Sequence, residues 1–211
     1  LAEEMSRYWA LQVIYGNGTG DNLRGILSTS RISAVESVKD SNTRDFDFYP
    51  IELSGIEDSI GDTDPTAANS AIDKAIDLTI ALPSPYLAGA TFTMNRRTLG
   101  QYRKLKDLEG RPLIQFESGS FTLVGYGVNI EDYMPDVDGT NPAAYAQVSM
   151  RMPVIFGQLS KAYALCHISD DFLVDPYSAD GGVMLKYESR KGDIVQHNDA
   201  IVVFRTDADF V

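Results

Sequence analysis

The sequence has few of the residues from which catalytic sites are built. Its 211 residues include one cysteine, Cys166, and two histidines, His167 and His197. A single cysteine excludes an internal disulfide and favours a reducing compartment. Cys166 and His167 are neighbours, and adjacent residues of a strand point to opposite faces, so we do not expect a nucleophilic pair.

Catalytic and metal-binding motifs are lacking as well. The sequence contains no G-x-S-x-G elbow, no H-E-x-x-H motif and no Cys/His cluster. Acid pairs such as Asp170 and Asp171 are common in so acidic a chain. We therefore expect no enzyme activity, no cofactor, and no catalytic, cofactor-binding or metal-binding residues.

Positive charge and long apolar runs are also scarce. Lys and Arg number 18 against 30 Asp and Glu, a formal net charge of −12. This balance argues against tight nucleic-acid binding, which relies on Lys and Arg beside phosphates. No apolar run approaches the roughly 18 residues of a membrane span. We expect neither a membrane nor sequence-specific nucleic acid as a partner.

Two loops superficially look like ligand-binding motifs. Residues 16–20, GNGTG, lack the Gly-Lys-Ser/Thr ending of a phosphate-binding loop, and they follow a predicted helix where a dinucleotide fingerprint follows a strand. We interpret them as a turn. Residues 136–141, DVDGTN, look like a calcium loop, but Gln147 stands where an EF-hand needs Glu. We interpret this segment as an acidic loop.

Apolar periodicity predicts three helices. Residues 2–15 are apolar around most of their circumference, which predicts a helix covered on several sides. Residues 65–82 begin with proline after a capping Asp64, and their apolar stripe includes Ile76. Asn95 is placed to cap a third helix, whose apolar stripe is Leu99, Tyr102 and Leu105.

Alternating and continuous apolar patterns predict strands. Residues 91–94 alternate as on a half-buried strand, and residues 121–130 predict a hairpin. Residues 183–188 alternate too, so we expect a long half-buried strand there, followed by a turn at 190–193. The apolar run 200–204 fits an interior strand.

These segments together resemble the major capsid proteins of tailed bacteriophages. The resemblance covers nearly the whole chain and lies in GNGTGDNLRGIL (16–27), MNRRTLGQYRKLKDLEGRPL (94–113), GYGV (125–128), VIFG (154–157), DPY (175–177) and AIVVF (200–204). Gly127 departs from the family, which usually has proline there. The resemblance implies an α+β fold with a peripheral domain, residues 1–52 and 166–211, and an axial domain, residues 53–165.

The resemblance also implies a function without an active site. Such proteins are structural and self-assemble into hexamers and pentamers of an icosahedral shell around double-stranded DNA. The implied location is the virion capsid, assembled in the bacterial host cytoplasm, with scaffold, protease and portal proteins as further partners. The family's N-terminal arm and extended loop, which precede a long spine helix, are not in this sequence. We therefore expect this chain to fold without building shells.

Two alternatives remain open. An encapsulin-like compartment would have the same fold but hold enzymes in place of DNA, and a cargo-peptide pocket would distinguish it. A soluble metal-binding or hydrolytic domain belongs to a different class, and a pocket with converging acids would support it.

Overall fold

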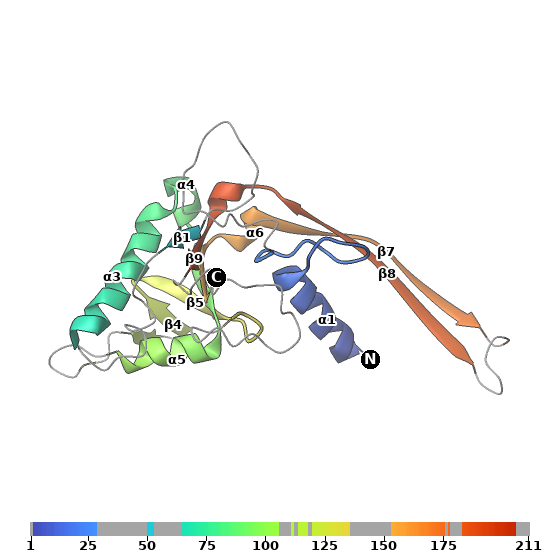
Figure 1. The fold of residues 1–211 in the computed structure, drawn as a ribbon, viewed down its shortest axis with the longest axis horizontal. Coiled ribbons are helices and arrows are strands. Elements are labelled where there is room, and N and C mark those ends of the chain that lie inside the picture. Colours follow the sequence, from blue (N-terminus) through green and yellow to red (C-terminus); the bar gives the residue numbers. More distant parts are fainter. Residues whose placement is uncertain are drawn as a thin grey trace, which may run out of the picture.

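The computed structural model describes residues 2–28, 50–52, 65–105, 111, 114–117, 120–135, 153–175, 177 and 183–205. They form a body built on a seven-stranded sheet, from which a long two-stranded hairpin projects (Figure 1). The acidic loop predicted at 136–141 lies outside the described residues. None of the helices in the described ranges is long and apolar enough to cross a membrane.

The helices lie close to their predicted positions. They are α1 (Ala2–Tyr15), α3 (Pro65–Ala81), α4 (Ser84–Leu87), α5 (Arg96–Lys104) and α6 (Leu159–Ala162), with a short 3-10 turn, η1 (Asn198–Ala200). The three helices predicted from periodicity correspond to α1, α3 and α5. α1 has its predicted bounds and α3 ends one residue earlier than predicted. α5 begins after Asn95 as predicted but ends at Lys104, so Leu105 of its predicted stripe is the C-cap.

The sheet mixes parallel and antiparallel pairs. In spatial order its strands are β1 (Pro50–Glu52), β9 (Ile201–Arg205), β6 (Val154–Gly157), β2 (Thr91–Met94), β5 (Tyr126–Ile130), β4 (Ser120–Leu123) and β3 (Gln115–Glu117). β2 runs parallel to β5 and antiparallel to β6, whereas β1 runs parallel to β9. The remaining two strands, β7 (Tyr163–Asp175) and β8 (Met184–Val195), form the projecting hairpin.

One face of the sheet forms a first core beneath α3 and α5. Phe92, Phe156 and Val202 lie side by side on β2, β6 and β9, and all three belong to this core. The rings of Phe92 and Phe156 pack with centroids 4.4 Å apart. Aromatic and aliphatic pairs of this kind, directly opposite each other on neighbouring strands, are the main stabilising contacts of a sheet.

The opposite face of the same strands forms a second core against the end of α1. Ile155 and Val203 are paired on β6 and β9, and both are buried there with Ile14 and Tyr15 of α1. Because both faces are covered, residues 201–204 are apolar throughout, as predicted for an interior strand.

Two predictions about buried faces are wrong. The strand at 91–94 is not half-buried, because Thr93 is only 4% exposed on the face toward α1. Of the stripe predicted for α3, Ala75 and, just past the helix, Leu82 are buried, whereas Ile76 is 37% exposed and Leu78, outside the stripe, is buried. The helix is rotated so that Leu78 faces the first core.

The predicted turn at 16–20 is confirmed, and it leads the chain back onto α1. The amides of Ile26 and Leu27 donate to the carbonyls of Val13 and Ile14, at N–O distances of 2.8 and 2.9 Å. Gly25 lies against the helix end so closely that an added Cβ would be 2.6 Å from the Ile14 carbonyl oxygen. Only glycine permits this approach.

Candidate assembly interface

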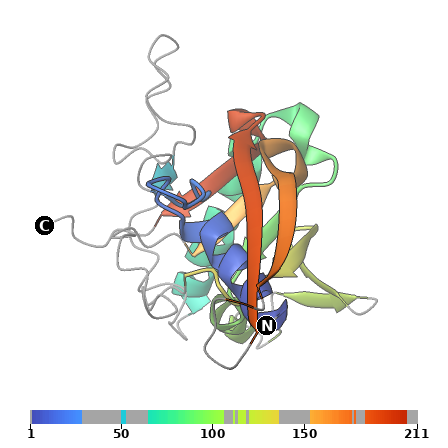
Figure 2. The same ribbon diagram turned by 90° about the vertical axis from the view of Figure 1, so that its right-hand side faces the viewer.

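The β7–β8 hairpin extends away from the body and is its most exposed element. Its strands pair antiparallel from Tyr163 opposite Val195 to Asp175 opposite Met184. Figure 1 shows it reaching far beyond α1, and Figure 2 views it from its free end. The turn predicted at 190–193 is wrong, because these residues lie within β8 and pair with residues of β7. Long-range strand pairing overrides the local turn preference of this segment.

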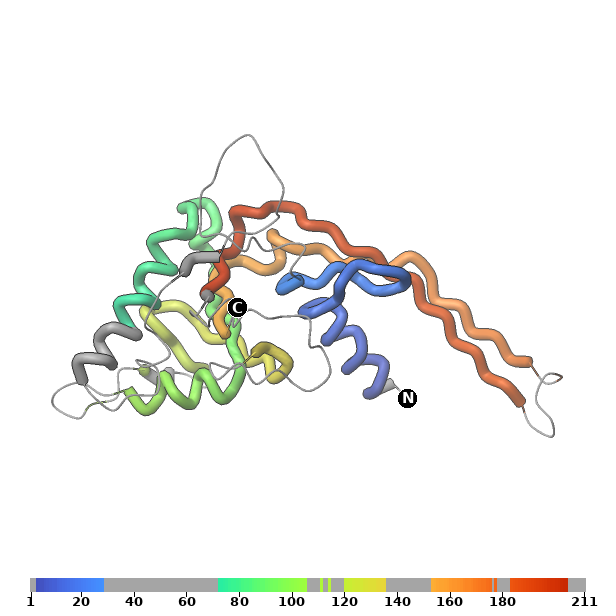
Figure 3. Tube along the Cα trace, in the orientation of Figure 1, coloured from blue at the N-terminus to red at the C-terminus, as the bar shows by residue number. Residues whose placement is uncertain are grey.

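The hairpin is anchored to the body at its base. The amide of Gln196 donates to the carbonyl of Ala162 at 2.9 Å, and the amide of Arg24 donates to Oδ1 of Asp193 at 3.1 Å. Figure 3 shows the segment after α1 running beside this base. α1 itself touches the hairpin through Trp9, whose ring centroid lies 4.2 Å from Nζ of Lys191.

A β-bulge divides the hairpin's side chains between two faces. The pairing shifts between His167 and Ser169, so Ile168 is the extra residue and the alternation of β7 changes phase there. The face toward α1, here called the inner face, carries Leu165 and, beyond the bulge, Asp170 and Phe172. The opposite or outer face carries Cys166, Ile168, Asp171 and Leu173.

Large apolar side chains are exposed on both faces of the hairpin. Between 44% and 69% of the side chain is exposed at Leu165, Ile168, Phe172, Leu173, Val174, Val183, Met184, Leu185 and Ile194. The prediction of a half-buried strand at 183–188 is therefore wrong for a single copy, because α1 covers only part of the inner face. So many exposed apolar side chains on one element indicate an interaction surface.

A polar cluster joins the two strands on the inner face. Nε2 of His167 lies 2.9 Å from Oδ1 of Asp170, and Ser189 and Tyr187 of β8 lie beside this carboxylate. The neighbouring Ser189 hydroxyl, followed by His167 and Tyr187, lowers the pKa of Asp170 to about 2. The same cluster raises the pKa of Tyr187, chiefly through its bond to Asp170.

The residues considered as catalytic candidates do not converge. Cys166 is exposed on the outer face, whereas His167 is paired with Asp170 on the inner face. His197 lies at η1 beside the ring of Tyr86. The described ranges contain no group of three His, Cys, Asp or Glu side chains that would hold a metal. The sequence did not reveal the Asp170 cluster, because the bulge that brings it together leaves no signal in the residue pattern.

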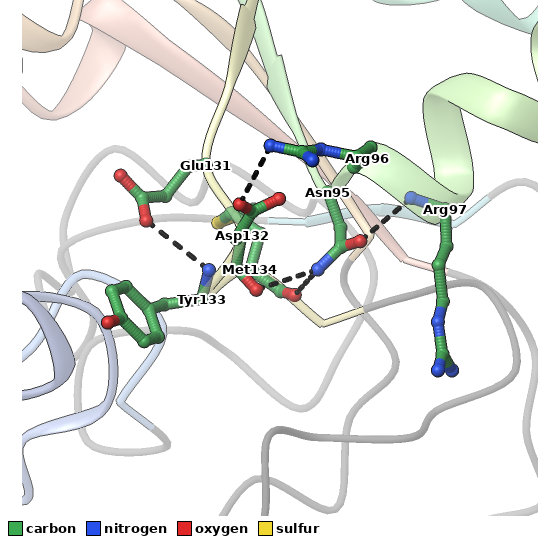
Figure 4. Close-up of polar contacts among 7 residues, drawn as sticks. All are labelled: Asn95, Arg96, Arg97, Glu131, Asp132, Tyr133 and Met134. Carbon is green, nitrogen blue, oxygen red and sulfur yellow. Dashed lines mark hydrogen bonds and ion pairs between the residues drawn. The ribbon is translucent and has the colours of Figure 1, made fainter.

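A second polar site joins the start of α5 to the loop at 131–134 (Figure 4). As predicted, Asn95 caps α5: its Oδ1 accepts the amide of Arg97 at 2.8 Å. Its Nδ2 also donates to the carbonyl oxygens of Asp132 and Met134, at 2.8 and 2.9 Å. The loop held in this way presents the carbonyl of residue 133 to the hydroxyl of Tyr15, at 2.8 Å.

Comparison with solved structures shows what this architecture is similar to. The capsid of the native GTA particle superposes with a TM-score of 0.71 at 28% identity, and the alignment covers 98% of this chain and 63% of that one. The capsid of the empty GTA particle gives a TM-score of 0.69 at 26% identity, with 98% and 64% covered. A chain from Gordonia phage Cozz shares the fold, with a TM-score of 0.50 at 18% identity, covering 98% and 62%.

The family comparison covers almost the whole chain. The model described as the phage capsid family matches residues 1–206, whereas no curated protein matches. The chain spans slightly less than two thirds of the length of the GTA capsid chains. The α+β capsid fold predicted from the sequence is confirmed. The chain belongs to the phage capsid family.

Proposed function

We propose that the protein is a major capsid protein, whose copies build the icosahedral shell of a tailed phage, a prophage or a GTA-like particle. The projecting hairpin carries this proposal, because its apolar side chains have too little cover within one copy. A two-stranded hairpin is only marginally stable alone in water. Packing against another copy would bury these side chains at about 1.5–3 kcal/mol for each one fully covered.

The assembly is a ring of repeated head-to-tail contacts. The hairpin of one copy would pack on a different surface of the next copy, and contacts of this kind close into hexamers and pentamers. Each contact is modest, and the shell is stable because every copy makes several. The role is structural, and no step in it requires catalysis.

We propose that the body and the projecting hairpin belong to the two predicted domains. In this proposal the body is the axial domain, at residues 53–165, and the hairpin with α1 forms the peripheral domain, from 1–52 and 166–211. β1 and β9 fall within the peripheral ranges but pair into the seven-stranded sheet, so the two domains would share that sheet.

The content of the shell is double-stranded DNA in this proposal. A net charge of −12 suits a wall that does not hold its contents tightly, because DNA is also negatively charged. Assembly would take place in the bacterial cytoplasm, with scaffold, protease and portal proteins as partners. An encapsulin-like compartment would be distinguished by protein cargo in purified shells in place of nuclease-protected DNA.

The test is assembly of hairpin variants of the coat protein expressed from its complete gene. Leu173→Asp alters the outer face and Leu185→Asp the inner face, at side chains that are 58% and 63% exposed. Ile80→Asp on α3 is the control, because Ile80 is 75% exposed outside the hairpin. We expect folded monomers from all three variants, and shells by electron microscopy only from the control. Normal shells from both hairpin variants, or equal loss in all three, would overturn the assignment of the hairpin.

A further inference from the structure

A local excess of positive charge surrounds α5, which runs along one edge of the body (Figure 1). Residues 94–113 contain six Lys and Arg against two Asp and Glu, in a chain with a net charge of −12. The buried residues of the helix are Thr98, Leu99 and Tyr102. An α-helix has about 3.6 residues per turn, so five other residues share the side away from this core. They form what is here called the basic face: Arg96, Arg97, Gly100, Arg103 and Lys104.

Three residues of the basic face are unfavourable for the helix that carries them. Arg96 and Arg97 stand in the first turn of α5, which has no acidic residue. Positive charge is unfavourable there, because the free N–H groups of the first turn form the positive end of the helix dipole. Gly100 lies in the helix interior, where glycine is a poor helix former, and a Cβ added to it would meet nothing within 4 Å. Packing within one copy therefore explains neither the glycine nor the two cations.

The cations of the basic face are only partly neutralised within one copy. Arg96 pairs with Asp132 at an Nη2–Oδ2 distance of 3.2 Å, and Figure 4 shows the Arg97 side chain pointing away from this pair. Neither Arg103 nor Lys104 forms an ion pair with a carboxylate of the described residues. Residues that conflict with their local structure are expected at functional sites. Here the cations would attract an anionic surface, and the glycine would let that surface approach the helix backbone closely.

We propose that the basic face of α5 binds an acidic surface of a second copy in the assembled ring, an inference that rests on the proposed function. Copies with a net charge of −12 repel one another, and a locally positive face that meets an acidic surface offsets this repulsion. Two basic faces would also repel each other, so the contact is heterologous, as a closed ring requires.

The second copy fits this face better than DNA, the other anion of the proposed particle. The hairpin contact already holds the neighbouring copy close, so the contact at α5 needs little affinity of its own. DNA would have to bind against the net charge of the whole chain, because its affinity for proteins depends on an excess of Lys and Arg.

Charge reversal on the basic face tests the proposal in the coat protein expressed from its complete gene. Arg97→Glu combined with Lys104→Glu should raise the protein concentration needed for assembly about tenfold, the effect of two exposed ion pairs turned into repulsions. NaCl should partly restore assembly, because salt screens the repulsion. Arg7→Glu combined with Lys161→Glu is the control, since it changes the net charge equally at exposed residues of α1 and α6. We expect the control to assemble close to the wild-type concentration, measured by light scattering.

Gly100→Leu tests the close approach to α5 without changing charge. Leucine is a better helix former than glycine and has open space here, so the melting temperature of the unassembled protein should rise. In the proposed contact the same side chain would hold the neighbouring copy away from the helix, and assembly should require at least about tenfold more protein. A folding defect cannot produce these opposite effects. Ala81→Leu adds an exposed leucine to α3 and should leave assembly unaltered.

Several results would overturn the proposal. One is normal assembly of both the charge-reversed double variant and Gly100→Leu, and another is an equal loss of assembly in the Arg7 and Lys161 control. Unaltered assembly with a loss of binding to a labelled DNA duplex would assign the basic face to DNA. Each of these results would leave the proposed function intact, because the hairpin variants test it separately. A wild-type protein that forms no oligomers would overturn both.

Discussion

Replacing Asn95 by alanine removes three hydrogen bonds at the joint between α5, the sheet and the loop at 131–134. The cap of α5 accounts for about 1 kcal/mol of the free energy of unfolding. The two bonds to the carbonyls of Asp132 and Met134 add about 0.5–1.5 kcal/mol each. The carbonyl of Met134 is the more buried of the two and contributes more when left unpaired. We expect Asn95→Ala to lower the free energy of unfolding by about 2–4 kcal/mol.

Urea unfolding, followed by circular dichroism, measures this loss, and Asn95→Asp separates its parts. Aspartate keeps the oxygen that accepts the amide of Arg97, but its carboxylate cannot donate to the two carbonyls. We therefore expect an intermediate loss in Asn95→Asp. A loss below about 1 kcal/mol in the alanine variant would refute the reasoning, because the cap alone would explain it.

Four further substitutions test individual features of the fold. Gly25→Ala places a Cβ 2.6 Å from the Ile14 carbonyl oxygen and should lower the free energy of unfolding by about 2–4 kcal/mol, measured with urea. Gly100→Ala in α5 places a Cβ in open space and should raise the free energy of unfolding by about 0.5–1 kcal/mol. Val124 has φ of 52° in the turn before β5, so Val124→Asn should raise the melting temperature by relieving strain; a lower value would mean that its packing on the first core dominates. The carboxyl of Asp170 should titrate near pH 2 by NMR and move toward its ordinary 3.8 in Ser189→Ala. Because folding lowers this pKa, the cluster's contribution to the free energy of unfolding is present above pH 3.8 and disappears as the pH falls through about 2. An unchanged titration midpoint of Asp170 in Ser189→Ala would contradict the role given to Ser189.

Local signals made the helices of the body predictable. Asn95 is a favourable cap followed by a stripe at helical spacing, and the structure places Leu99, Tyr102 and Leu105 in the first core as expected. The proline that opens α3 marks its first turn in the same way. In these segments the capping residue or proline and the apolar stripe lie within a few residues of each other. A short stretch of sequence is therefore enough to predict the helix.

Features that depend on distant parts of the chain were not predictable. Residues 190–193 have turn-forming character, but they pair with β7 across the hairpin. The side-chain amide of Asn95 donates hydrogen bonds to backbone carbonyls 37 and 39 residues away, and nothing near Asn95 in the sequence indicates these bonds. Residues 183–188 were expected to form a half-buried strand because apolar and polar residues alternate there. Such alternation indicates that one face of a strand is covered, but it does not tell whether the covering surface belongs to the same copy.

The most direct test of the account is a cryo-electron microscopy reconstruction of shells formed by the coat protein expressed from its complete gene. The account predicts that Leu173 and Leu185 of the hairpin are covered by a neighbouring copy in the reconstruction. Shells in which both faces of the distal hairpin remain in contact with solvent would contradict it.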